Sequence, residues 1–206
     1  MGSMMWREAW SGRLALVVGL AVAPMAQAAN DPLDRIGGTE AIQVRFDAAT
    51  HQTQVSGKVA SDLCFSFALP EEWRLTEGGL KAAVSHADLS IGYRSAEELR
   101  DMPQSDLAIR DAAVLQRDYE EMLGRPAQSV SLSSKAGATQ WSATWIDASL
   151  PAASHAMTVE TLIVPLSSEW VLELSLSGVE SREAYDTLAW SLLARLKVQG
   201  RAACRS

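Results

Sequence analysis

Apolar and polar residues alternate along several short runs in the second half of this 206-residue chain. The alternating runs cover residues 129–133, 141–145, 157–163 and 170–176. A period of two is the spacing at which the side chains of a β-strand point to the same face of a sheet. Each run is short and is separated from the next by a brief connection, so neighbouring strands can pair directly. The pattern therefore predicts an antiparallel meander.

The first half of the chain also contains strand patterns, although they are less regular. The predicted strands cover residues 42–46, 53–59 and 64–69, with a hairpin of 83–86 and 89–94 turning at Ala87-Asp88. Pro70 ends the third strand, because proline has no amide hydrogen for a sheet hydrogen bond.

Helical spacing appears in two longer segments. Residues 106–123 carry an apolar stripe with charged residues opposite, and Gly124 and Pro126 follow as stop signals. The stripe consists of Ala108, Ala112, Leu115, Tyr119 and Met122. Residues 181–197 predict a final helix, with an inner face of Tyr185, Leu188, Leu192 and Leu196. The capping box of Ser95 and Glu98 predicts a further short helix that stops before Pro103.

These elements predict an α+β domain with six to seven mostly antiparallel strands and helices packed on the apolar face of the sheet. We expect this single domain to cover residues 41–206, after a flexible leader at 29–40. The opposite face of the sheet is expected to be polar. That polar face would consist of Ser129, Ser131, Ser133, Gln140, Ser142, Thr144, Glu160 and Glu173.

The first 28 residues have the features of a secretory signal peptide. Arg7 and Arg13 precede an apolar run from Leu14 to Ala23, and small residues follow at the Ala26-Gln27-Ala28 site. An uncleaved membrane anchor is the alternative. The apolar run would span only about 15 Å as a helix, half of a bilayer core of about 30 Å. We therefore predict cleavage after Ala28 and a soluble periplasmic protein without stable membrane insertion.

Cys64 and Cys204 are the two cysteines of the chain. An even number of cysteines in an exported protein favours pairing. The alternative, a nucleophilic Cys64, lacks a basic or electropositive neighbour in the sequence. We therefore expect a Cys64–Cys204 disulfide. The chain-entropy model gives about 5 kcal/mol for closing a loop of this length, as an upper figure.

The residues give little support to catalysis, metal binding or nucleic-acid binding. The formal net charge is −7 and no cluster of Lys and Arg occurs, which argues against a nucleic-acid partner. His51, His86 and His155 lack metal-ligand spacing, and no nucleotide-binding or serine-nucleophile motif is present. The pairs Glu71-Glu72 and Glu120-Glu121 are expected to be solvated. We therefore expect no cofactor, no metal and no catalytic residue.

Three tryptophans are candidates for binding. Trp141 and Trp145 share one face of a strand, where they form either core beneath a helix or a platform for a sugar or peptide. Core is the preferred interpretation. Trp190 falls on the charged side of the final helix, where it is either covered by the C-terminal tail or exposed as a contact residue.

The segment Phe65-Ser-Phe-Ala-Leu-Pro-Glu-Glu-Trp73 resembles the opening of PsbP-like domains, and residues 170–178 with the final helix resemble their ending. This family includes an extrinsic photosystem II protein and DcrB-like and LpqN-like bacterial envelope proteins. The resemblance implies an αβα sandwich around an antiparallel sheet. It also implies a non-catalytic envelope role, and no site residue carries over from the family.

The sequence thus favours an exported, non-enzymatic binding or accessory protein, with another envelope protein or a small ligand as its partner. Two alternatives remain open. One is an immunity-type inhibitor of a periplasmic toxin, for which a flat acidic face would be evidence. The other is a hydrolase, for which a deep pocket holding His86 or His155 beside a carboxylate would be evidence.

Overall fold

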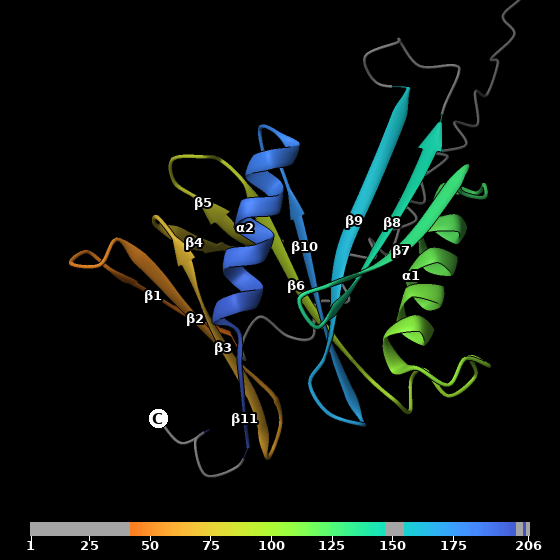
Figure 1. Cartoon of the computed structure of the whole chain (residues 1–206), viewed down its shortest axis with the longest axis horizontal. Coiled ribbons are helices and arrows are strands. Elements are labelled where there is room, and N and C mark those ends of the chain that lie inside the picture. Colours follow the sequence, from red (N-terminus) through yellow and green to blue (C-terminus); the bar gives the residue numbers. More distant parts are fainter. Residues whose placement is uncertain (1–41, 147–154, 201–203, 205–206) are drawn as a thin grey trace, which may run out of the picture.

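The computed structural model of the chain describes residues 42–146, 155–200 and 204, and within them it contains eleven strands and two helices (Figure 1). The strands are β1 (Ile42–Asp47), β2 (Gln52–Ala60), β3 (Leu63–Pro70), β4 (Trp73–Thr76), β5 (Gly79–Ala82), β6 (Asp88–Ser95), β7 (Ser129–Lys135), β8 (Ala138–Ile146), β9 (Ala156–Pro165), β10 (Trp170–Ser177) and β11 (Lys197–Gly200). The helices are α1 (Leu107–Leu123) and α2 (Arg182–Arg195).

The strands form two antiparallel sheets. One has seven strands in the order β4-β5-β6-β10-β9-β8-β7, and the other has four in the order β1-β2-β3-β11. The predicted α+β class, with a seven-stranded antiparallel sheet and packed helices, is confirmed. The sequence did not predict that the first strands and the last strand would leave this sheet to form a second one.

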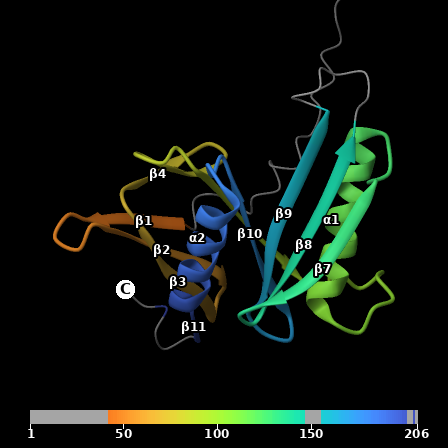
Figure 2. The ribbon, with the colours of Figure 1, turned by 45° about the horizontal axis from the view of Figure 1, so that its top comes forward.

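The seven-stranded sheet is covered on both faces. Helix α1 packs on β8, β9 and β10, and side chains such as Ile163 and Val171 meet it from the sheet. Helix α2 and the four-stranded sheet cover the other face, where Leu162, Leu172 and Leu174 point. Figures 1 and 2 show α1 beside β7 and β8, and α2 between β3 and β10. The alternating residues of β10 therefore contribute to two separate cores.

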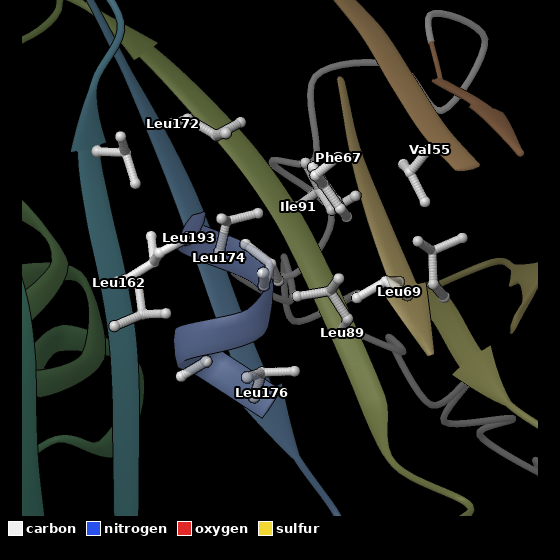
Figure 3. Close-up of a cluster of buried hydrophobic side chains, with 14 of the residues drawn as sticks. Val55, Phe67, Leu69, Leu89, Ile91, Leu162, Leu172, Leu174, Leu176 and Leu193 are labelled. Carbon is white, nitrogen blue, oxygen red and sulfur yellow. The ribbon is translucent and has the colours of Figure 1, made fainter. Parts of the chain in front are cut away.

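The larger core joins the two sheets and α2 (Figure 3). Leu174 and Leu176 of β10 share this cluster with Leu193 of α2 and with Phe67 and Leu69 of β3. Because this cluster includes residues from β1 to α2, one continuous core holds the two sheets and α2 together. Burial of these aliphatic and aromatic side chains contributes about 2 kcal/mol for each fully buried side chain.

Several predicted element boundaries are confirmed. Strand β3 ends at Pro70, and α1 begins after Asp106, whose Oδ1 accepts a hydrogen bond from the Ile109 amide at 3.0 Å. Gly124 ends α1 with a φ of 65°, a left-handed conformation that glycine adopts without steric cost. Ala108, Ala112 and Leu115 of the stripe are buried as expected and Tyr119 is partly buried, whereas Met122 is 45% exposed.

Three predicted elements differ from the structure. Strand β6 forms its hairpin with β5 and not with residues 83–86. The carboxylate of Glu71 holds the 83–86 segment in a bend, because it accepts hydrogen bonds from Val84 and Ser85. Ser95 and Glu98 do form the reciprocal hydrogen bonds of a capping box, but only turns follow them. The final helix ends at Arg195, since residues 197–200 pair with β3 as β11.

The predicted polar face is largely correct, with one exception. Ser131 of β7 lies opposite Ser142 of β8, which lies opposite Glu160 of β9, so these residues share the face away from α1. Glu173 was expected on the same face. It instead lies on the α1 face, because its pairing with Ile163 places it beside the α1 core.

Cys64 and Cys204 form a disulfide, with Cα atoms 5.8 Å apart, as predicted. The bond joins Cys64 in β3 to Cys204, which follows β11 and lies 140 residues later in the chain. This is consistent with an oxidising compartment. No helix in the described part of the chain is long and apolar enough to cross a membrane. The predicted signal peptide at 1–28 and leader at 29–40 lie outside the described residues.

Candidate functional site

A pocket of about 540 Å³ lies between α1 and the neighbouring strands β6 and β10. Its volume is within the range typical of small-molecule sites. The strands supply Ser90, Ile91, Gly92, Tyr93, Arg94, Glu173 and Ser175, and the helix and the turn before it supply Glu98, Val114, Leu115, Arg117, Asp118 and Tyr119.

Small residues on the α1-facing side of β6 and β10 leave space for this pocket. Ser90 of β6 lies opposite Ser175 of β10, and Gly92 lies opposite Glu173. Because Ser90, Gly92 and Ser175 have short side chains or none, they leave space between the sheet and α1. Helix α1 packs over β8, β9 and β10, and its edge leaves the α1-facing side of β6 open. Strand β5 pairs only with the beginning of β6, which widens the opening further.

Arg94 is the central charged residue of the site. Its Nε donates a hydrogen bond to Glu173 Oε1 at 3.1 Å, and its Nη1 donates one to Asp118 Oδ2 at 3.4 Å. The same Nε lies 3.1 Å from Asp111 Oδ1. Three carboxyl groups from α1 and β10 thus surround one guanidinium from β6. We call these four residues the Arg94 cluster.

Asp111 is the innermost member of the cluster, and its side chain is fully buried. The single hydrogen on Arg94 Nε points to Glu173, so neither oxygen of Asp111 accepts a hydrogen bond despite its short distance from that nitrogen. Burial and the negative charge of Glu173 together raise the pKa of Asp111 to about 9. This pKa favours the protonated form of Asp111 at neutral pH.

Gly92 provides the space that Glu173 occupies. A Cβ atom at this position would lie 3.2 Å from Glu173 Oε2, closer than ordinary van der Waals contact. The two residues are cross-strand partners on the α1 face. The absent side chain at Gly92 thus lets the carboxylate lie across β6 toward Arg94.

The residues first considered for chemistry do not gather at this pocket. His51 and His86 lie in exposed turns and His155 precedes β9, and none of them lines the pocket. Within the described ranges, no group of three or more His, Cys, Asp and Glu residues could hold a metal ion. Glu71 braces the 83–86 turn, and Glu120 accepts a hydrogen bond from the Ala127 amide.

The preferred core position of Trp141 and Trp145 is confirmed, whereas the spacing had left Trp190 open. Trp141 and Trp145 are fully buried beneath α1, with ring centroids 5.8 Å and 5.6 Å from that of Tyr119. The platform interpretation of this pair is therefore wrong. Trp190 is 54% exposed on α2, which favours its interpretation as a contact residue. Cys64 is occupied in the disulfide and has no free thiol.

The Arg94 cluster was not identified from the sequence, although a signal was present. Asp111 and Asp118 are seven residues apart, which places them on one side of α1, next to the apolar stripe. Glu173 is the one charged residue in the apolar run 170–176. Charged residues at positions that border a core suggest a buried polar site, but the spacing does not reveal the shared Arg94.

Comparison with family models, with curated proteins and with solved structures finds no match to this chain.

Proposed function

We propose that this protein is an exported, non-enzymatic binding protein that receives a small ligand in the pocket between α1, β6 and β10. The observation that carries the proposal is the pocket itself, whose 540 Å³ volume and mixed lining suit a small organic molecule. Val114 and Leu115 supply apolar contacts, while Ser90, Ser175 and the Arg94 cluster supply polar ones.

A binding role explains the pocket better than a hydrolase does. A carboxylic acid beside a carboxylate, such as Asp111 and Glu173, is a pairing used for acid and base catalysis. Asp111 does not line the pocket, however, and its oxygens are inaccessible. The histidines that would support a hydrolase are also elsewhere. The pair is better explained as a support that holds Arg94 and Glu173 in place.

The inhibitor alternative is also less well supported. An immunity-type inhibitor would need acidic groups that a basic partner could contact. The side chains of Asp118 and Glu173 are only 10% and 15% exposed, so the acidic residues of the cluster are turned inward. A small molecule that enters the pocket can reach them, whereas a protein surface cannot.

The cellular location belongs to the same proposal. The charged, apolar and small-residue segments at 1–28 favour export by a signal peptide, and the Cys64–Cys204 disulfide supports an oxidising compartment such as the periplasm. The resemblance of residues 65–73 to PsbP-like domains stays a prediction, and it agrees with a non-catalytic envelope role.

Native mass spectrometry of the exported protein tests the binding proposal. We expect a small-molecule adduct on the wild-type protein after incubation with a periplasmic metabolite extract. Ser175→Trp fills the pocket and should abolish the adduct. Ser131→Trp, on the exposed far face of β7, is the matched control and should retain it. An adduct that persists in Ser175→Trp, or no adduct on the wild type, would reject the proposal.

A further inference from the structure

We propose that β7 is an interaction surface for a second copy of this chain, whose own β7 pairs with it antiparallel about a two-fold axis at Leu132. Such pairing joins the two seven-stranded sheets into one continuous sheet. The surface is separate from the pocket between α1, β6 and β10. Three features of β7 support the pairing, namely its free edge, the apolar side chains that it exposes, and the distribution of its charge.

Strand β7 is the outermost strand of the seven-stranded sheet, with β8 on one side and an open edge on the other (Figures 1 and 2). Ala136 and Gly137 form a two-residue turn with φ angles of 49° and 84°, so the residues that flank the turn exchange hydrogen bonds. Bonded pairs alternate along an antiparallel ladder. The amide and carbonyl groups of Val130, Leu132 and Ser134 therefore point away from β8, and no described residue pairs with them.

The other sheet edges carry features that discourage pairing, whereas β7 does not. Strands β4 and β11 have four residues each and contain Arg74 and Lys197. Strand β1 contains Arg45 and Asp47. Natural proteins protect edge strands by short length and by charge. Strand β7 has seven residues, and the first six are exposed and uncharged, with no proline and no register shift; its one charged residue, Lys135, is the last.

Two apolar side chains of β7 are left uncovered by the fold. Val130 lies opposite Ala143 and Leu132 lies opposite Trp141, so both point to the α1 face. Helix α1 packs on β8, β9 and β10, and Val130 and Leu132 remain 41% and 48% exposed. An added strand would cover these side chains and also satisfy the hydrogen-bonding groups of the edge.

The sequence of β7 is suited to pairing with itself. With the two-fold axis at Leu132, this leucine meets its own copy. Val130 then lies opposite Ser134 of the second copy, and Ser131 lies opposite Ser133 of the second copy. Leucine thus packs on leucine at the centre, and small serines flank it without steric conflict. Because Leu132 is one of the residues that point outward, the two copies can exchange hydrogen bonds at the axis.

Charge favours the same arrangement. The chain has a formal net charge of −7, so two copies repel each other at long range. Strand β7 has no acidic residue, and the side chain of Lys135 contacts Asp186 of α2. Antiparallel pairing places each Lys135 opposite Ser129 of the other copy, at the two ends of the interface. Parallel pairing would set the two Lys135 side chains next to each other, and like charges at such positions destabilise a sheet.

The length of β7 determines the expected strength of the dimer. Seven residues at about 3.4 Å each span about 24 Å, and an edge of this length buries less than the roughly 800 Å² per partner of a standard stable interface. We therefore expect a dimer that forms reversibly and becomes populated as the protein concentration rises.

Sedimentation equilibrium of the oxidised protein between about 10 µM and 1 mM tests the pairing. We expect the average mass to rise with concentration from that of a monomer toward twice that value. Leu132→Lys places two like charges at the axis and should raise the dissociation constant at least about tenfold. Leu75→Lys, at a similarly exposed leucine on β4, is the matched control and should dimerise like the wild type.

Cysteine cross-linking tests the register. Leu132→Cys should form a disulfide with its own copy on mild oxidation, because directly opposite bonded residues have Cα atoms about 5.5 Å apart. Ser134→Cys is the control and should not cross-link, because the two copies of this residue would lie about 14 Å apart along the strands. Both variants keep the Cys64–Cys204 disulfide.

Three outcomes would overturn the inference. A wild-type protein that stays monomeric at every concentration would exclude a second copy and leave the edge to a strand of another protein. Dimerisation of Leu132→Lys as strong as that of the wild type would show that the copies meet elsewhere. Cross-linking of Ser134→Cys as efficient as that of Leu132→Cys would refute the two-fold register.

Discussion

The buried carboxyl of Asp111 predicts an unusual dependence of stability on pH. Its pKa is raised from 3.8 to about 9 in the folded protein, chiefly by burial. Below pH 3.8 both the folded and the unfolded chain hold the proton. Between 3.8 and about 9 the unfolded carboxyl loses its proton while the folded one keeps it. The free energy of unfolding therefore falls as pH rises through this range.

The size of the effect follows from the pKa difference. One pKa unit corresponds to about 1.4 kcal/mol, so the full difference of about five units would amount to roughly 7 kcal/mol. This is comparable with the entire stability of many domains, about 5–15 kcal/mol. Rearrangement of Arg94 around an ionised Asp111 reduces the loss, and we expect a measured slope of about 1 kcal/mol per pH unit between pH 5 and 8.

Asp111→Asn tests this reasoning. Asparagine has the shape of the protonated acid and can still donate to Glu173, but it does not titrate. We expect the pH slope to disappear and the variant to exceed the wild type in stability by about 3 kcal/mol at pH 7. Urea unfolding of the oxidised proteins at pH 5, 6, 7 and 8 measures both quantities.

The control is Asp106→Asn, which changes an exposed carboxyl at the N-terminus of the same helix. Asparagine caps a helix as well as aspartate does, so this variant should keep the wild-type slope. The chosen pH range lies above the lowered pKa of Asp47 and Asp186, whose stabilising contributions are lost only in acid. Parallel pH curves for wild type and Asp111→Asn, or lower stability of the variant at pH 8, would refute a protonated Asp111.

Three further predictions concern stability, and each can be measured by urea or thermal unfolding. Replacing both Cys64 and Cys204 with serine should lower the free energy of unfolding by up to about 5 kcal/mol, since the bond closes a long loop; an unchanged melting temperature would contradict this. Trp145→Ala should lower the free energy of unfolding by about 3–5 kcal/mol, because this side chain is fully buried. Trp190→Ala, on the exposed side of α2, should change it by less than about 0.5 kcal/mol. Equal effects of the two substitutions would contradict the assigned burial. Gly92→Ala should cost about 1–3 kcal/mol by displacing the Glu173 carboxylate, and a neutral result would show that Glu173 can move without loss.

Much of the fold could be predicted from local patterns. The strands β7 to β10 follow from their period of two, and α1 follows from its stripe, its N-cap at Asp106 and the stop at Gly124. These signals depend on residues close in sequence. The short strands β4 and β5 were missed because each has four residues, too few to show a period. Strand β11 was missed because it has only four residues and is a strand through its pairing with β3, which is distant in sequence.

The site was harder to predict because its parts come from elements distant in sequence. Arg94 and Glu173 are joined by the pairing of β6 with β10, a register that neither strand encodes alone. Glu173 was assigned to the polar face because a glutamate in an alternating strand is usually solvated. Its actual position requires a partner charge on β6 and a glycine at position 92, and both became apparent only when the two strands were placed side by side.

The Arg94 cluster also indicates why this position in the fold suits a binding site. Replacing a buried ion pair by apolar residues is often neutral or stabilising, so a cluster with an excess carboxyl adds little to stability. Asp111 also lowers stability, because its burial makes the free energy of unfolding fall as pH rises. A group that costs stability at neutral pH, on a helix whose other inner residues pack well, is better explained by the pocket beside it than by the fold. Asp111→Asn is therefore expected to make the protein more stable at neutral pH while leaving the pocket beside it in place.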